Sequence, residues 1–224
     1  SLLTGGTFNS NNYSISYAAG SLIVNQAPLT ISANSRTKTY GDTVTFSGSE
    51  YASTGLKNNE TLGSATIAST GASPASSYSA SPYPISISSV TGGSINPINS
   101  SNYAISYING GLTVNKANLT VTANSYAKTY GDSMTFVGSE FTTSGLKNNE
   151  TVATATLISS GSPSTAPYSV SPYAITPSAL SGGTFSPNNY NISYLNGGLT
   201  VNKANLTVTG NSIVKTYGDL ITFT

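Results

Sequence analysis

Apolar and polar residues alternate along most of this chain with a period of two. Aliphatic or aromatic residues alternate with Thr, Ser or Ala. The pattern is seen at 103–107, 112–114, 119–123, 134–136 and 153–157. Successive side chains of a strand point to opposite faces, so the pattern predicts half-buried strands with threonine outward. No segment has the spacing of an amphipathic helix, although 50–60 and 140–150 could each accommodate a helical turn.

Turn signals separate these strands. The strongest is Asn-Gly-Gly, which stands between two predicted strands at 109–111 and again at 196–198. Asn-Gly tolerates the positive φ of a type I′ turn, so we predict a tight hairpin there. About six or seven short strands in every ~90 residues predict an all-β fold, with small β-sandwich (Ig-like) domains in an elongated tandem array. The alternative is a β-grasp-like domain with one short helix.

Long blocks of sequence recur in the same order. The block at 101–125 returns at 188–212 and, in degraded form, at 11–35. A three-residue difference in length falls between 92–103 and 182–190, in a Pro/Asn/Ser stretch typical of a loop. The recurrence divides the chain into a C-terminal half-repeat at 1–26, full repeats at 27–116 and 117–203, and an N-terminal half-repeat at 204–224.

The two half-repeats cannot complete one domain together, because neither holds a counterpart of residues 137–177. We expect the chain to be a slice of a longer array, since isolated two- or three-stranded pieces are marginally stable. The strands of 1–26 and 204–224 should then be covered by neighbouring sequence or by another copy through edge addition.

One pentapeptide, Lys-Thr-Tyr-Gly-Asp, occurs once in each of the last three segments. Its glycine can supply a positive φ between two strands, its aspartate can hydrogen-bond amides of the same turn, and its tyrosine can close the core. A motif that returns once per repeat more often belongs to the fold than to an active site. We therefore interpret as a structural corner Tyr40, Gly41, Asp42, Tyr130, Gly131, Asp132, Tyr217, Gly218 and Asp219.

The amino-acid composition disfavours several classes of partner and of catalytic site. Charged residues make up 7% of the chain and the net charge is +1, which disfavours nucleic acid and anionic lipid as partners. The chain has no Cys, no His and no Trp, so it lacks disulfides, thiol nucleophiles and the commonest general base and transition-metal ligand. No apolar run approaches the ~18 residues of a membrane-spanning helix, so direct membrane insertion is not expected.

The remaining candidate chemistry is sparse. Each full repeat has one Asp and two Glu, and no nucleophile has an obvious base, so we expect neither an enzyme nor a cofactor. A calcium site at a domain junction has its candidates in Asp42 and Asp132, helped by backbone carbonyls. Lys38 and Lys128 are the positions for an intramolecular Lys–Asn isopeptide bond, but we interpret them as surface lysines. Glu60 and Glu150 are interpreted as solvated turn charges.

The order of these motifs resembles a known family. "LTVTAN", "KTYGD", "SGLKNNET", "SPYAI" and "NYNISYLNGGLTVNKA" succeed one another as in the MBG repeat domain of the YGX/YDG type. That domain is found in tandem in large bacterial surface proteins, including adhesins of the filamentous-haemagglutinin kind. The resemblance covers the whole chain and implies an exported, non-catalytic role at the bacterial cell surface. It names no ligand.

These observations favour a structural function, namely stalk repeats of a bacterial surface adhesin or fibre. The connection within 112–123 contains few residues between strands and no Gly at its centre, which leaves little hinge freedom. The expected partners are neighbouring repeats or other copies in a fibre. The first alternative is an adhesive module that binds a host glycan or protein through the variable loops at 68–80 and 158–170. The second is a subunit of a surface filament or sheath.

Overall fold

A computed structural model describes residues 6–94 and 102–223. Its contacts divide the chain into two compact units whose boundaries differ from those of the repeats. Unit 1 comprises Ser1–Asn34, Phe46–Ile67 and Ser86–Asn109, and unit 2 comprises Ser35–Thr45, Ala68–Ile85 and Gly110–Thr224. Unit 2 therefore contains the whole second repeat together with one end of the first. The division into repeats remains a prediction from the sequence.

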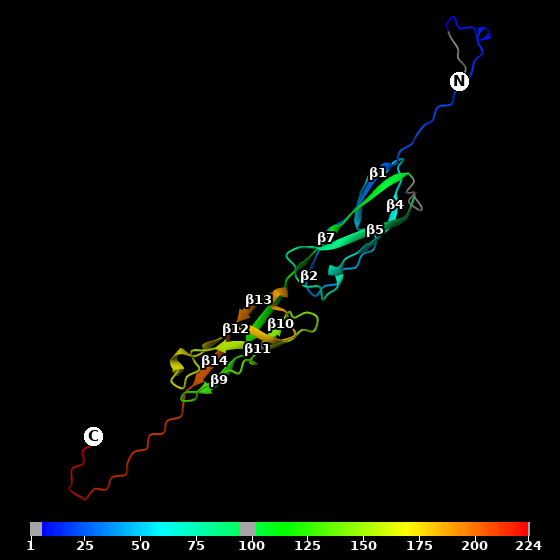
Figure 1. Cartoon of the computed structure of the whole chain (residues 1–224). Helices are drawn as coiled ribbons and strands as arrows, with labels where there is room; N and C mark the ends of the chain where they lie inside the picture. The colour runs from blue at the N-terminus through cyan, green and yellow to red at the C-terminus, as the bar shows by residue number, and fades with distance from the viewer. Residues whose placement is uncertain (1–5, 95–101, 224) are drawn as a thin grey trace. The chain divides into compact units, whose positions relative to one another are not determined.

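The second repeat forms two sheets within unit 2 (Figure 1). In the three-stranded sheet, β8 (Ala117–Ala123) lies between β10 (Phe141–Ser144), which is antiparallel, and β13 (Tyr190–Leu195), which is parallel. The four-stranded sheet has the order β11 (Val152–Ile158), β12 (Tyr173–Gly183), β14 (Gly197–Asn202) and β9 (Tyr126–Thr129). The fold is all-β and sandwich-like.

The strands of the first repeat pair in the same order. One sheet has the order β3 (Tyr51–Thr54), β1 (Ala27–Ala33) and β6 (Tyr103–Ile108). The other has the order β2 (Arg36–Thr39), β7 (Gly110–Asn115), β5 (Tyr83–Gly93) and β4 (Leu62–Ala68). The boundary between the two units falls inside β5, after Ile85.

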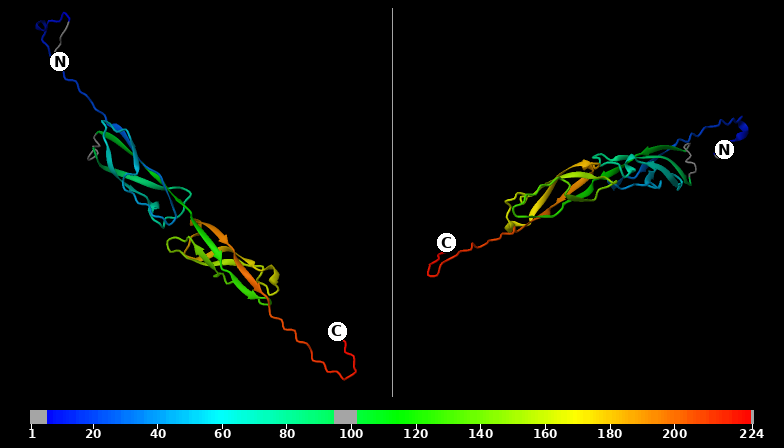
Figure 2. Two further views of the ribbon diagram at one scale, coloured as in Figure 1. Left: turned by 180° about the vertical axis from the view of Figure 1, so that it is seen from behind. Right: turned by 90° about the horizontal axis from the view of Figure 1, so that it is seen from below.

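Alternation along the strands builds the cores. On β8 the side chains of Leu119 and Val121 are fully buried, whereas Thr120 and Thr122 remain partly exposed. One cluster of unit 2 lies around Ile175, Leu199 and Val201, with Met134 and Phe136 packed against it. The strands that carry it, β12 and β14, lie side by side in each view (Figure 2). In unit 1, Leu29 and Ile31 of β1 are buried in the same way.

The predicted Asn-Gly-Gly hairpin is wrong. β6 and β7 are separated only by Asn109, yet they belong to different sheets. β6 pairs in parallel with β1, and β7 pairs in parallel with β2. The segment β1–β2 and the segment β6–β7 therefore pass side by side from the first sheet to the second. The backbone N–H and C=O groups of β6 and β7 that would pair in a hairpin instead bond to β1 and β2. The same holds for β13 and β14 in the second repeat, which pair with β8 and β9.

Two local expectations also fail. Met134 and Phe136 pack on the core, but the segment 134–136 belongs to no strand. The stretches 50–60 and 140–150 form a strand and then a tight turn, and they contain no helical turn. Among the described residues the helical segments are 3-10 turns of three residues, such as η2 (Thr70–Ala72) and η4 (Pro187–Asn189). The short helix of the β-grasp alternative is not among them.

The half-repeats form no strand within the part of the chain that the structure describes, which covers 6–26 and 204–223 of them. Their apolar side chains are exposed, including Tyr13 at 64% and Leu206 at 87%. None of the described residues covers these side chains, so covering by neighbouring sequence or by another copy stays a prediction. Most of the predicted difference in loop length falls on 95–101, which lies outside the described residues.

Candidate functional site at the junction of two repeats

The corner begins with its glycine. Gly41 has a φ of +92°, Gly131 of +102° and Gly218 of +96°. Residues other than glycine rarely adopt this backbone conformation. The next residue, aspartate, closes the turn through its backbone: the Asp42 amide donates to the Thr39 carbonyl over 3.0 Å, and the Asp132 amide donates to that of Thr129 over 3.0 Å. The pentapeptide therefore makes the same tight turn wherever it occurs.

The lysine of the motif is buried, which corrects its interpretation as a surface residue. Lys38 is 6% exposed and Lys128 is 8% exposed. The Lys38 ammonium donates to the backbone carbonyl of Asp42 over 3.0 Å and to that of Ser73, and Lys128 is held in the same way. Burial lowers the pKa of Lys38, partly offset by Asp42. The lysine thus ties the corner to the loop after η2 or to its counterpart in the other repeat.

A second turn faces the corner from the next repeat. Asn148 and Asn149 both have positive φ, at +52° and +56°, and the Glu150 amide donates to the Lys147 carbonyl over 2.9 Å. This is the geometry of a type I′ turn, with asparagines where positive φ is required. The turn presents its own amide and carboxylate to one tyrosine: the Lys147 amide donates to the Tyr190 hydroxyl over 2.9 Å, and that hydroxyl donates to Glu150 Oε2.

Tyr40 enters this turn from the preceding repeat, and both partners belong to unit 2. The Tyr40 side chain is only 4% exposed, and its hydroxyl donates to Glu150 Oε1 over 2.7 Å. Its ring meets the ring of Tyr190 edge-on, with centroids 5.6 Å apart and an interplanar angle of 82°. One carboxylate therefore binds two phenol groups from different repeats. We call Lys147, Glu150, Asn189 and Tyr190 the socket, and the Tyr40 corner the plug.

The plug and socket share an apolar core. The cluster contains Tyr40 and Val114 from the first repeat together with Leu119, Val121 and Tyr190 from the second. Only Lys116 separates β7 from β8 along the chain. The two sides of the junction therefore bury apolar side chains in one continuous cluster.

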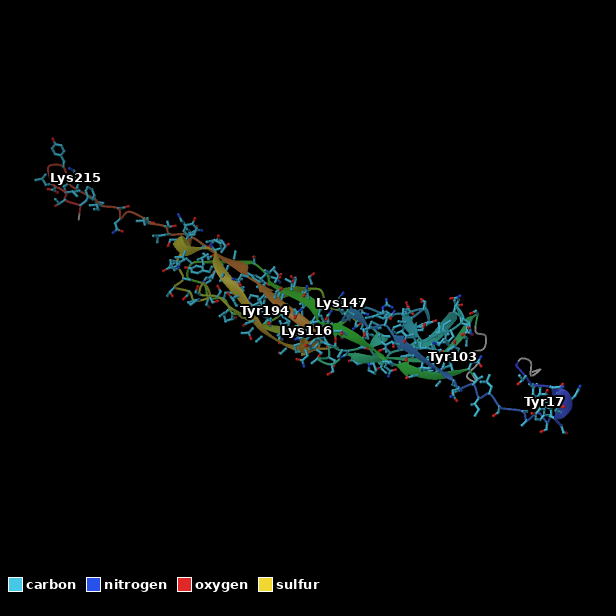
Figure 3. The ribbon with its side chains drawn as sticks, turned by 90° about the horizontal axis from the view of Figure 1, so that it is seen from above. Tyr17, Tyr103, Lys116, Lys147, Tyr194 and Lys215 are labelled. Carbon is cyan, nitrogen blue, oxygen red and sulfur yellow. The ribbon has the colours of Figure 1, made fainter. Side chains whose placement is uncertain are left out.

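Polar contacts flank the plug. The Tyr78 amide donates to Asn189 Oδ1 over 2.9 Å, and Asn148 Nδ2 donates to the Pro74 carbonyl over 3.1 Å. The Lys116 ammonium lies 5.0 Å from the centre of the Tyr78 ring, within range of a cation–π interaction. Figure 3 labels Lys116 and Lys147 at this junction. Asn189 is 3% exposed as a result.

The electrostatics keep the hydroxyls protonated. Burial is the larger cause that raises the pKa of Tyr40 above its ordinary value of 10.0, and the hydrogen bond to Glu150 is the second. The same two causes, in the same order, raise the pKa of Tyr190. Both hydroxyls are therefore donors at neutral pH. Each oxygen of the Glu150 carboxylate therefore accepts a hydrogen bond from a phenol.

Unit 1 contains the same socket, built from its own residues. The Lys57 amide donates to the Tyr103 hydroxyl over 2.9 Å, and the hydroxyl donates to Glu60 Oε2. The hydrogen bond to Glu60, with burial second, raises the pKa of Tyr103. Tyr103 is 4% exposed and is labelled in Figure 3. The interpretation of Glu60 and Glu150 as solvated turn charges was thus wrong, because each is half-buried and binds a tyrosine.

The sequence did carry a signal for these residues. The turn Lys-Asn-Asn-Glu and the dipeptide Asn-Tyr both recur in the two full repeats although the length between them differs. At the corner itself, the backbone carbonyl of Asp42, one of the two residues considered for calcium, accepts a hydrogen bond from the Lys38 ammonium. Within the described residues, no three Asp, Glu, His or Cys side chains gather as metal ligands.

Comparisons with known proteins agree with the repeat pattern. The sequence pattern of the MBG domain (YGX type) matches residues 29–113 and 119–200. No curated protein and no solved structure matches the chain. Over the residues that the structure describes, no helix has the length and apolarity needed to cross a bilayer. Because the two matches span more than half of its length, the chain belongs to the MBG domain family of the YGX type, a family of repeat domains of surface proteins.

Proposed function

We propose that these repeats are non-catalytic stalk segments of an exported bacterial surface protein, and that they hold a distal part of that protein away from the cell. The observation that supports this most is the plug and socket of unit 2. Tyr40 is buried, its hydroxyl binds Glu150 of the next repeat, and Tyr40 and Val114 share a core cluster with residues of that repeat. A connection of one residue with a bonded interface resists bending, which is what a spacer requires.

Small-angle X-ray scattering of the full chain at low concentration tests the proposal. We expect the wild type and Tyr130→Ala to scatter as chains with a fixed junction, because Tyr130 is not part of it. Tyr40→Ala should scatter as a more flexible chain. If the wild type already scatters like Tyr40→Ala, the junction does not fix the repeats and the stalk proposal fails.

Location is tested separately. An antibody raised against the chain should stain intact cells that express the parent protein, without permeabilisation. Staining that appears only after permeabilisation would contradict the extracellular part of the proposal. It would leave the mechanical role of the junction untouched, because the scattering experiment measures the isolated chain.

An adhesive module is the alternative, and one observation favours it. Tyr168, in the variable loop at 158–170, is 51% exposed and lines an open pocket of about 590 Å³ with Tyr130 and Lys203. The corresponding loop at 68–80 is engaged at the junction through Pro74 and Tyr78. A glycan array probed with the wild type and with Tyr168→Ala separates the two functions. Binding lost in the variant would favour adhesion.

A further inference from the structure

The first and last strands of the second repeat run side by side in the same direction. β8 and β9 form an N-terminal arm at 117–129, and β13 and β14 form a C-terminal arm at 190–202. β13 pairs in parallel with β8 in one sheet, and β14 pairs in parallel with β9 in the other (Figure 1). All four strands belong to unit 2. The two arms therefore stay together through both sheets.

The register between the arms does not change where they pass from one sheet to the other. Partners lie 73 residues apart along the chain in both ladders, from the pair of Tyr190 with Ala117 onward. At the passage itself, the Gly198 amide donates to Ser125 Oγ over 2.9 Å, so a side chain bridges the gap between the two ladders. We call this continuous line of contacts between the arms the seam.

Other bonds reinforce the seam. The hydroxyls of Thr120 and Ser193 lie 3.2 Å apart, and beyond the end of β9 the Tyr130 amide donates to the Asn202 carbonyl over 2.9 Å. The inner faces of the arms carry fully buried side chains, namely Leu119, Val121, Leu199 and Val201. Sliding one arm past the other would therefore break the seam and open the core together.

Tension on the chain would act lengthwise along this seam. The chain enters the repeat at Ala117 and leaves it at Asn202, and these residues lie at opposite ends of the parallel arms. Pulling on them would make the arms slide past each other. Because the bonds of a parallel ladder are evenly spaced along the strands, they would bear the load together. Pulling the arms apart from one end would instead break the bonds one after another.

We propose that each full repeat is a force-bearing module whose paired terminal arms resist tension along the chain. The first repeat has the same pairing, in which β6 lies parallel to β1 and β7 parallel to β2, and the Gly111 amide donates to Ser35 Oγ over 3.0 Å. Only Lys116 separates β7 from β8, so both repeats bear the same tension in series. This inference goes beyond the stalk function, because sliding within a repeat and bending at a junction are different deformations. Its failure would leave the scattering result unchanged.

Force measurements with optical tweezers on the full chain test the proposal. The chain has no cysteine, so two introduced cysteines are unique attachment points. Asn118→Cys combined with Asn202→Cys loads the seam lengthwise. Ala127→Cys combined with Asn202→Cys loads it crosswise near one end, because Ala127 pairs with Thr200. All three substituted positions are exposed.

The repeat should open at a several-fold higher force when it is pulled lengthwise, at the same loading rate. Forced opening depends on the unfolding barrier in the pulled direction, whereas the equilibrium stability is the same for both attachments. Urea denaturation of each variant checks that stability. If Asn118→Cys does not fold, Lys116→Cys replaces it, because that residue immediately precedes β8.

Ser125→Ala tests the seam at its middle. It removes the side-chain bond to the Gly198 amide and should lower the force of lengthwise opening. Ser133→Ala is the matched control, because Ser133 is an exposed serine outside both arms, and it should leave that force unchanged. Equal forces in the two pulling directions, a lower force for lengthwise pulling, or equal effects of the two serine variants would each overturn the proposal.

Discussion

The Tyr40 and Tyr130 corners have the same five residues and the same backbone, yet their tyrosines have opposite environments. The exposed fraction is 4% for Tyr40 and 49% for Tyr130. The glycine geometry and the buried lysine are alike at both corners. The difference lies in the sequence C-terminal to each repeat: a full repeat with its socket packs on Tyr40, whereas the described residues after the second repeat form no strand.

The comparison separates two kinds of contribution within one motif. Glycine, aspartate and lysine shape the corner from within, so they act in every repeat regardless of neighbours. Tyrosine acts only when another repeat supplies a carboxylate and an aromatic ring. Substitutions in the first group should therefore destabilise both corners, whereas substitution of the tyrosine should destabilise only the corner that another repeat covers.

The largest difference is expected for tyrosine. Tyr40→Ala should lower the free energy of unfolding of unit 2 by about 3–5 kcal/mol, the usual cost of deleting a buried aromatic side chain. Tyr130→Ala should lie within about 0.5 kcal/mol of the wild type, as expected of a surface position. Urea denaturation of the full chain measures both. Equal losses at the two sites would mean that the neighbouring repeat contributes little to the environment of Tyr40.

The glycine tests the positive φ, which both corners share. Gly41→Val and Gly131→Val should each cost about 1–3 kcal/mol, because a β-branched residue is strained at positive φ. A side chain at Gly41 would also meet Lys147 Cγ at 2.6 Å and Cβ at 2.7 Å, and these atoms lie next to the backbone of a hydrogen-bonded turn, so Gly41→Val should cost more than Gly131→Val. Thermal melting of the two variants decides this. An unchanged melting temperature in Gly131→Val would show that the positive φ is not a constraint.

The parts of the fold and of the site that the sequence predicts are those whose contacting residues lie close together along the chain. The strand at 117–123 was predictable, because its alternation is local. The role of Glu150 was not, because it binds Tyr40 and Tyr190, which lie 110 and 40 residues away along the chain. Lys38 looked like a surface lysine for the same reason, since the Ser73 carbonyl that holds it comes from a distant loop.

The hairpin error has a related physical origin. Asn-Gly-Gly at 109–111 has the local chemistry of a type I′ turn, but the type I′ geometry in this chain is found in the Lys-Asn-Asn-Glu turn. Turn propensity describes which conformations a few residues tolerate. Parallel pairing of β6 with β1 and of β7 with β2 decides which conformation they adopt. Sheet membership is a tertiary property and was therefore out of reach of periodicity.

A smaller effect is expected from the Tyr40 hydroxyl alone. Tyr40→Phe should cost about 1 kcal/mol at neutral pH through the lost hydrogen bond to Glu150. The pKa of Tyr40 is raised in the folded chain, so its contribution is complete below the ordinary tyrosine pKa of 10.0 and is lost as the pH rises through the folded value. The stability difference between the wild type and Tyr40→Phe should therefore shrink above pH 10. A difference that stays constant to higher pH would contradict the hydrogen bond.

The smallest effect involves no neighbouring repeat, and it should be somewhat larger at Glu50 than at Glu140, because the Ser47 hydroxyl also donates to Glu50 and Val137 has no hydroxyl. The Glu50 carboxylate accepts from the Ser47 and Gly48 amides, and Glu140 accepts from those of Val137 and Gly138. The amide of Ser47 contributes most to lowering the pKa of Glu50 to about 2, and that of Val137 contributes most to lowering the pKa of Glu140.

A lowered pKa means that each carboxylate stabilises the fold above its ordinary pKa of 4.5 and that this contribution is lost as the pH falls towards the folded value. Glu50→Gln and Glu140→Gln should therefore each lower stability slightly at pH 7, and the difference from the wild type should shrink below pH 4.5. Chemical denaturation of the two variants between pH 7 and pH 3 measures this. Each of these turns lies within one repeat, so small losses in both variants would confirm that the contrast between the two tyrosines comes from the junction. A large loss in only one variant would show that the repeats differ in stability for internal reasons, and the tyrosine comparison would then need correction by that amount.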